Sequence, residues 1–245
     1  MKNFVKTLID LVMGAVIPII ILDRFSGPEA LGPVAAYIVA AMIPVGWVFI
    51  DLFFITKKFN FITSYVGFTS LVGGLLAFWF VDGITYAFKD TVGWMLRTLI
   101  FGGSILIGKP ILKLFFAQAL NADTPGKEQA LNRLMSEPSV IRATNIATWI
   151  VVVESALAGI ANFFLNWWMV LAPFGSELFN QQVAQVNAIT RVALSVPSML
   201  AFMIAMWIMF QAIYKQLPSE EGKQQLDSDF WDLVKLREGR ELELS

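Results

Sequence analysis

The residues of this sequence best suited to chemistry are a few polar side chains embedded in apolar stretches. Glu154 follows three consecutive valines inside the stretch 143–172, and Asn162 lies further along that stretch. Arg97 and Arg191 lie near the ends of two other apolar stretches. A charge within a membrane-spanning segment costs about 2.5–3.5 kcal/mol on insertion scales, so Glu154 must face protein or water, or be protonated.

Two interpretations of Glu154 follow from its position. In the first, Glu154 is a proton or cation site with Arg97 or Arg191 as its partner. Asn162 then helps to line a polar path, and a water-accessible cavity must reach Glu154. In the second, Glu154 forms a structural ion pair or lies near the lipid headgroups. A Glu154 packed away from water would contradict the first interpretation.

Most enzyme chemistry is excluded by what the chain lacks. The sequence contains no histidine and no cysteine, which removes disulfides, thiolate nucleophiles, the usual zinc, haem and iron–sulfur ligands, and imidazole acid–base catalysis. It also lacks a nucleophile elbow, a phosphate-binding glycine loop and carboxylates paired at helical spacing. We therefore expect no enzyme activity, no catalytic residue, no cofactor and no metal. A net charge of −1 gives no reason to expect nucleic-acid binding.

The composition is that of a membrane protein. Hydrophobic residues make up 57% of the chain, charged residues only 15%, and the mean hydropathy is +0.66, whereas soluble domains carry about 25% charge. Six apolar stretches predict an all-α, polytopic helical bundle with six transmembrane helices, at residues 7–22, 31–55, 61–81, 92–116, 143–172 and 187–214. Five spans remain the alternative, because the first stretch contains Asp10 and Pro18 and is short.

The positive charges predict the orientation of these spans. Most of the 18 Lys and Arg residues fall on one side when the connections are assigned alternately, and Lys and Arg are retained on the cytoplasmic side of short loops. Both termini are therefore expected in the cytoplasm. The other side would carry the short connections 25–30, 82–90 and 173–186.

Two cytoplasmic regions stand out from the bundle, which we assign to residues 1–216. The connection 117–139 is polar and is broken by Pro125 and Gly126, and it is either a partner-docking site or a simple connector. The tail 217–245 contains apolar residues near helical spacing between Asp227 and Arg237, which predicts an amphipathic helix. This helix could bury Phe230 and Trp231 or could remain frayed.

Three short motifs resemble the bacterial inner-membrane septation protein A family. They are a Gly-Lys-Pro-Ile with a following lysine at the end of the fourth stretch, an Ala-Gly-Ile-Ala-Asn in the fifth, and an Ile-Tyr-Lys-Gln-Leu-Pro that closes the sixth. The positions that carry the resemblance are Lys109, Pro110, Lys113, Gly159, Asn162, Tyr214 and Pro218. Their order covers nearly the whole span region, but Glu154, the long connection 117–139 and the acidic tail depart from the family pattern.

This resemblance implies a bacterial inner (plasma) membrane protein of cell-envelope maintenance and cell division. The family acts through contacts with other membrane proteins and has no established catalytic site. Our first hypothesis is therefore a non-enzymatic scaffold whose partners are the lipid bilayer and other membrane proteins of the envelope or division machinery. The alternatives are a small transporter or channel that uses Glu154, and an accessory subunit of a larger membrane complex.

Overall fold

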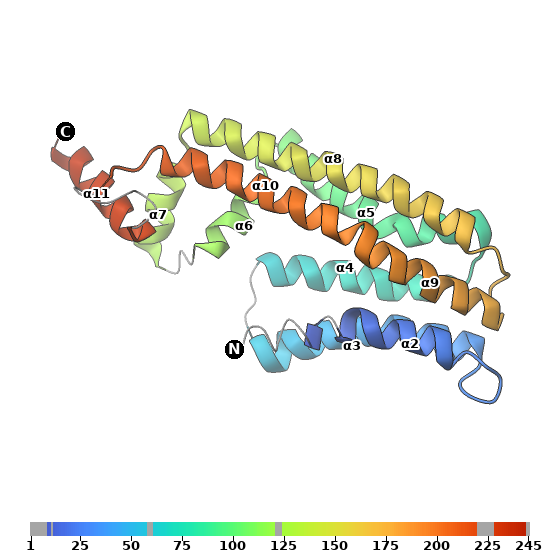
Figure 1. The fold of residues 1–245 in the computed structure, drawn as a ribbon. Helices are drawn as coiled ribbons and strands as arrows, with labels where there is room; N and C mark the ends of the chain where they lie inside the picture. The colour runs from blue at the N-terminus through green and yellow to red at the C-terminus, as the bar shows by residue number, and fades with distance from the viewer. Residues whose placement is uncertain (1–8, 11, 58–60, 121–123, 220–227, 244–245) are drawn as a thin grey trace. The chain divides into compact units, whose positions relative to one another are not determined.

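Every regular element in the described residues is a helix (Figure 1). The structure, a computed structural model, describes residues 9–10, 12–57, 61–120, 124–219 and 228–243. The elements are η1 (Val12–Val16), α2 (Ile17–Arg24), α3 (Pro33–Ile50), η2 (Asp51–Thr56), α4 (Phe61–Ala77), α5 (Gly83–Leu106), α6 (Leu112–Ala119), α7 (Pro125–Leu134), α8 (Pro138–Met169), α9 (Glu177–Ala193), α10 (Ser195–Tyr214) and α11 (Phe230–Glu243). The all-α prediction is confirmed for this part of the chain. The start of the first expected stretch lies outside the described residues. So do four of the lysines that were counted to predict the orientation of the spans, namely Lys2, Lys6, Lys58 and Lys223.

Three helical segments among the described residues are long and apolar enough to cross a membrane. They are Pro33–Ile55, Pro138–Met169 and Glu177–Tyr214, with mean hydropathies of 2.3, 1.7 and 2.0. Ser64–Ala77 is apolar but shorter. The described part of the chain is thus all-helical and has three helical segments compatible with a membrane, whereas the prediction of six spans is met only in part. The short α2 and the charged α5 account for much of the difference.

The fourth expected stretch, 92–116, is wrong in its boundaries. The structure has two helices in this region. Helix α5 begins earlier than expected, at Gly83, and ends at Leu106, and α6 begins at Leu112. Gly108 adopts a left-handed conformation with φ of 69°, and Pro110 cannot donate a backbone hydrogen bond, so α5 ends at Leu106 and does not continue into α6. Apolar residues on both sides of this turn made the stretch look continuous.

The prediction of an outer connection at residues 173–186 is also wrong, because α9 begins at Glu177. Ser176 caps this helix by accepting a hydrogen bond from the Phe179 amide at 3.1 Å. The polar residues of this segment, which had suggested a loop, form hydrogen bonds within the protein. Asn180 donates to the Ser26 hydroxyl at 2.8 Å and to the Pro33 carbonyl at 2.7 Å. The first turn of α10 then contains Pro197, which interrupts the helix after Ala193.

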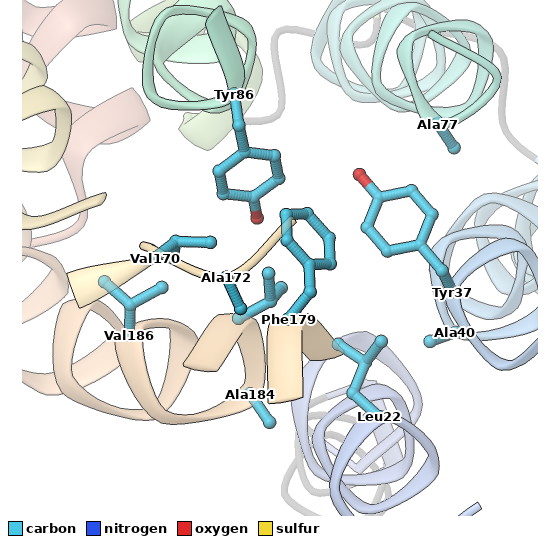
Figure 2. Packing of buried hydrophobic residues seen from close by; sticks show 11 residues of the cluster. Leu22, Tyr37, Ala40, Ala77, Tyr86, Val170, Ala172, Phe179, Ala184 and Val186 are labelled. Atoms are coloured by element: carbon cyan, nitrogen blue, oxygen red, sulfur yellow. The ribbon is translucent and has the colours of Figure 1, made fainter. Parts of the chain in front are cut away.

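The chain divides into two compact units. Unit 1 comprises Met1–Thr98 and Glu154–Ser198, and unit 2 comprises Leu99–Val153 and Met199–Ser245. The core of unit 1 centres on Phe179, whose ring lies 5.9 Å from the ring of Tyr37 and 5.1 Å from that of Tyr86 (Figure 2). This aromatic cluster joins α3, α5 and α9, and α3 also packs against α2 and α4.

In unit 2, the connection between α6 and α8 and the tail pack on each other. Arg133 on α7 pairs with Glu238 on α11, and Arg237 on α11 pairs with Glu137. The Trp231 indole donates to the Leu120 carbonyl at 3.1 Å. Phe230, Leu233 and Val234 of α11 are buried. The apolar face of the tail helix is therefore used within the chain.

Candidate functional site

Glu154 forms a local polar cluster with one residue from each of two other helices. Its Oε2 lies 3.3 Å from Arg97 Nη2 on α5, and its Oε1 accepts a hydrogen bond from the Ser198 hydroxyl on α10. The side chains of Arg97 and Glu154 are only 21% and 13% exposed. Oε2 is buried and has the Arg97 cation as its neighbour without a hydrogen bond, while Oε1 is hydrogen-bonded, so the arrangement is that of a structural ion pair. Arg191 is not its partner.

A cavity of about 340 Å³ lies elsewhere in unit 1, enclosed by η1, α2, α3, α4, α5 and α9. Its walls are apolar over much of their extent, and Glu154 is not among the residues that line it. The polar lining residues are Tyr37, Ser70, Tyr86, Lys89, Asp90, Asn187 and Arg191. We refer to this space as the unit 1 cavity.

Asp90 is held by two amides from α8. Asn162 Nδ2 donates to Asp90 Oδ2 at 3.0 Å, and Asn166 Nδ2 donates to the same oxygen at 2.9 Å. Both asparagines are buried, and they lie one helical turn apart, so they reach the same carboxylate. Asn162, which the sequence grouped with Glu154, thus contacts Asp90 instead.

Lys89 is a buried cation with a specific environment. Lys89 is only 5% exposed, and its ammonium group donates a hydrogen bond to the Trp79 carbonyl at 2.6 Å. The Nζ atom also lies 4.8 Å from the centre of the Tyr37 ring and 5.6 Å from that of the Tyr86 ring. The carbonyl and the two aromatic faces all favour the positive charge.

Arg191 brings a second cation to the unit 1 cavity. It projects from α9 and donates from Nη2 to the Gly14 carbonyl in the π-helical turn η1 at 2.8 Å. Unlike Lys89, Arg191 is exposed. The sequence offered Arg191 as a partner of Glu154, but in the structure it shares a cavity with Asp90.

Sequence reasoning missed Lys89 and Asp90 because it placed them in an outer connection. A usable signal was present, since Tyr86, Lys89, Asp90 and Gly93 follow the i, i+3, i+4, i+7 spacing of one helix face. All four line the cavity. A second signal was the i, i+4 pair of asparagines on α8, which marks a polar stripe in an otherwise apolar helix.

The residues that carry the family resemblance lie at helix ends and packing contacts. Lys109 and Pro110 form the turn after α5, where the Ile111 amide donates to the Ser104 hydroxyl at 3.0 Å. Lys113 lies in the first turn of α6 and Pro218 follows α10. A Cβ atom added to Gly159 would lie 3.0 Å from Trp94 Cβ, so the glycine permits close approach of α8 and α5.

Tyr214, the remaining motif residue, joins the end of α10 to the tail helix. Its ring lies 4.1 Å from that of Phe210 and 5.9 Å from that of Phe230 on α11. This contact belongs entirely to unit 2. None of the motif residues lines the cavity, and of them Asn162 contacts the lining residue Asp90.

The described residues contain no group of three or more Asp or Glu side chains that could hold a metal ion. What the arrangement offers is a cavity with two cations, one carboxylate, two phenols and an amide. Comparison of the chain with family models, with curated proteins and with solved structures finds no match. The function must therefore be argued from the site.

Proposed function

We propose that this chain is a multi-pass membrane protein that binds a small charged solute in the unit 1 cavity, as a transporter or solute receptor. The observation that carries the proposal is the gathering of Lys89, Asp90 and Arg191 around one cavity between apolar helices. Charged side chains at membrane depth are costly and are typical of substrate and ion pathways.

The form of the cavity supports this proposal. Small-molecule sites are mainly apolar cavities of roughly 300–1,000 Å³ with a few convergent polar groups, and the unit 1 cavity of about 340 Å³ has this composition. Its wall includes Pro18 and Pro44 and borders on the π-helical turn η1. Irregular helical backbone of this kind is common at functional sites and in transporters.

Glu154 has a different role in this proposal. Its charge is matched by Arg97 and its second oxygen by Ser198, and it does not line the cavity. We assign it to holding α5, α8 and α10 together in unit 1. A transporter that uses Glu154 as its ion site is the less favoured form of the hypothesis.

The membrane topology completes the proposal. We propose six spans, formed by the segment ending in α2, by α3, α4, α5 and α8, and by α9 with α10. Helix α5 has 24 residues, about 36 Å at 1.5 Å per residue, and is thus long enough to cross a bilayer. Its charges bond within unit 1. The excess of Lys and Arg in alternate connections supports cytoplasmic termini in a bacterial inner membrane.

The test is solute uptake by proteoliposomes that contain the full chain, with counter-ions and charged organic solutes as the panel. Arg191→Gln removes a cavity cation, and Arg24→Gln is its matched control because the Arg24 side chain is 77% exposed and pairs with neighbouring Asp23. Uptake or exchange that is lost in Arg191→Gln and kept in Arg24→Gln supports the proposal. Absence of both solute binding and flux in folded native protein contradicts it.

A second candidate is the envelope or division scaffold that the resemblance to septation protein A implies. It is supported by the position of Lys109, Pro110, Gly159 and Tyr214 at helix ends and crossings, where a shared fold would keep them. Crosslinking in native membranes tests it. If the protein is a scaffold, it should crosslink to the same partner proteins when Arg191→Gln removes the exposed cation from the cavity. A solute-binding protein needs no crosslinked partner protein.

A further inference from the structure

We infer that the solute of the unit 1 cavity is a small organic anion with one net negative charge and an apolar body, such as a monocarboxylate. This inference rests on the proposed solute-binding function and narrows it to a chemical class. It is drawn from the charge balance of the lining, from the donors that remain on the cations, and from the apolar walls.

The charge balance favours a monoanion. Arg191 is always protonated in proteins, and Lys89 donates to the Trp79 carbonyl and faces two aromatic rings, which are contacts that favour its cationic form. Asp90 is the one carboxylate among the described lining residues. The lining therefore carries a net positive charge in an apolar setting, where uncompensated charge is costly. A monoanion cancels this charge, a zwitterion leaves it in place, and an organic cation increases it.

The cations also retain the donors that a carboxylate needs. A guanidinium has five N–H donors in a planar fork that matches a carboxylate, and the bond to the Gly14 carbonyl uses one of them. Arg191 is exposed whereas Lys89 is buried, so Arg191 can meet an entering anion first. Asn187 and the two tyrosine hydroxyls add neutral hydrogen-bonding groups to the same cavity.

The remaining walls call for an apolar body on the anion. Leu22, Val45, Leu76 and Val183 line the cavity together with several alanines. A hydrated inorganic ion would leave these side chains without contacts, whereas an alkyl or aryl group would bury against them. A carboxylate attached to such a group satisfies both parts of the lining.

Three probes that share a phenyl ring and differ in charge separate the possible ligand charges. The full chain in lipid nanodiscs is titrated with benzoate, benzylamine and phenylalanine, and the dissociation constant and the rise in unfolding temperature are measured for each. Benzoate is expected to bind and stabilise most strongly. Arg191→Gln is expected to weaken benzoate about tenfold or more, because hydrogen bonds to charged groups contribute on that scale. Arg24→Gln should leave the dissociation constant unchanged.

Asp90→Asn gives the sharpest result because its sign depends on the ligand charge. The asparagine oxygen can still accept the amides of Asn162 and Asn166, so the variant removes a charge with little change in shape. It is expected to tighten benzoate binding. If benzylamine or phenylalanine binds most tightly and Asp90→Asn weakens that binding, the ligand class is wrong while the solute-binding function stands. If no probe of any charge binds to folded native protein, the inference and the proposed function both fail.

Discussion

Asn162 donates its side-chain amide to Asp90 at 3.0 Å, and this bond joins α8 to α5 through two residues that are 72 positions apart in the chain. Asn166 makes the same contact one turn later. Together the two amides fix the carboxylate at the wall of the unit 1 cavity without neutralising its charge. The polar residues of α8 therefore serve the cavity, although they lie outside its lining.

Asn162→Ala tests how much this bond stabilises unit 1. The variant leaves Asp90 with one amide donor in a buried setting, and we expect the free energy of unfolding to fall by about 1–3 kcal/mol. Unfolding of the detergent-solubilised chain by a denaturing detergent measures the change. Asn132→Ala, at an exposed position on α7, is the control and should differ little from the native chain. Equal stability of the two variants would show that the Asn162–Asp90 bond contributes nothing.

Glu154→Gln distinguishes an ion pair from a functional carboxylate. Loss of the charge leaves Arg97 without its partner, so we expect a stability loss of about 1–3 kcal/mol with solute binding unchanged. The double variant Glu154→Gln with Arg97→Gln should recover part of the loss, which a double-mutant cycle of unfolding free energies would show. A folded Glu154→Gln protein that no longer moves solute would return Glu154 to the centre of the mechanism.

Gly159→Ala tests the close approach of α8 and α5. The new Cβ would lie 3.0 Å from Trp94 Cβ, and overpacking of this kind costs about 1–3 kcal/mol. Gly103→Ala on α5 is the matched control, because nothing lies within 4 Å of the added atom. A helical Gly-to-Ala change at such a site is neutral or stabilises by up to about 1 kcal/mol. Thermal unfolding should therefore move in opposite directions, and the same shift in both variants would contradict the packing.

The salt bridges between the α6–α8 connection and the tail in unit 2 predict a rescue by charge exchange. Arg237→Glu places a negative charge opposite Glu137 and should release α11, with faster hydrogen exchange in residues 230–238. Glu137→Arg added to Arg237→Glu restores opposite charges and should restore the protection. If the single variant exchanges no faster than the native chain, the tail helix does not depend on this pair.

The sequence predicted the apolar helices well and the polar ones poorly, for one physical reason. Helices α3 and α8 fall where long apolar runs predicted them, because most of each run is apolar on every face. In α5 and α9, polar residues such as Asp90 and Asn180 form hydrogen bonds inside unit 1. A hydropathy pattern counts such residues as connections to water, and so the predicted helix began too late in both cases.

Hydropathy along the chain also explains why the sequence singled out Glu154 and not the charged residues of the unit 1 cavity. Glu154 stood out because it interrupts an apolar run, yet the structure gives it a local partner. Lys89 and Asp90 drew no attention because the sequence pattern assigned them to a connection between two apolar stretches. Which carboxylate meets which cation depends on how α5, α8 and α9 pack against one another. No spacing within a single helix contains that information.

The accessibility of the cavity to water and solute is the most direct test of the account. The chain has no cysteine, so Ser70→Cys introduces one thiol into the cavity lining, and Ala147→Cys, fully buried in unit 2, serves as the unreactive control. Labelling with a small anionic methanethiosulfonate reagent in nanodiscs is measured with and without a bound solute. The account predicts rapid labelling of Cys at position 70, protection by the solute, and loss of that protection when Arg191→Gln is added. Labelling as slow as at position 147, in folded protein, would contradict it.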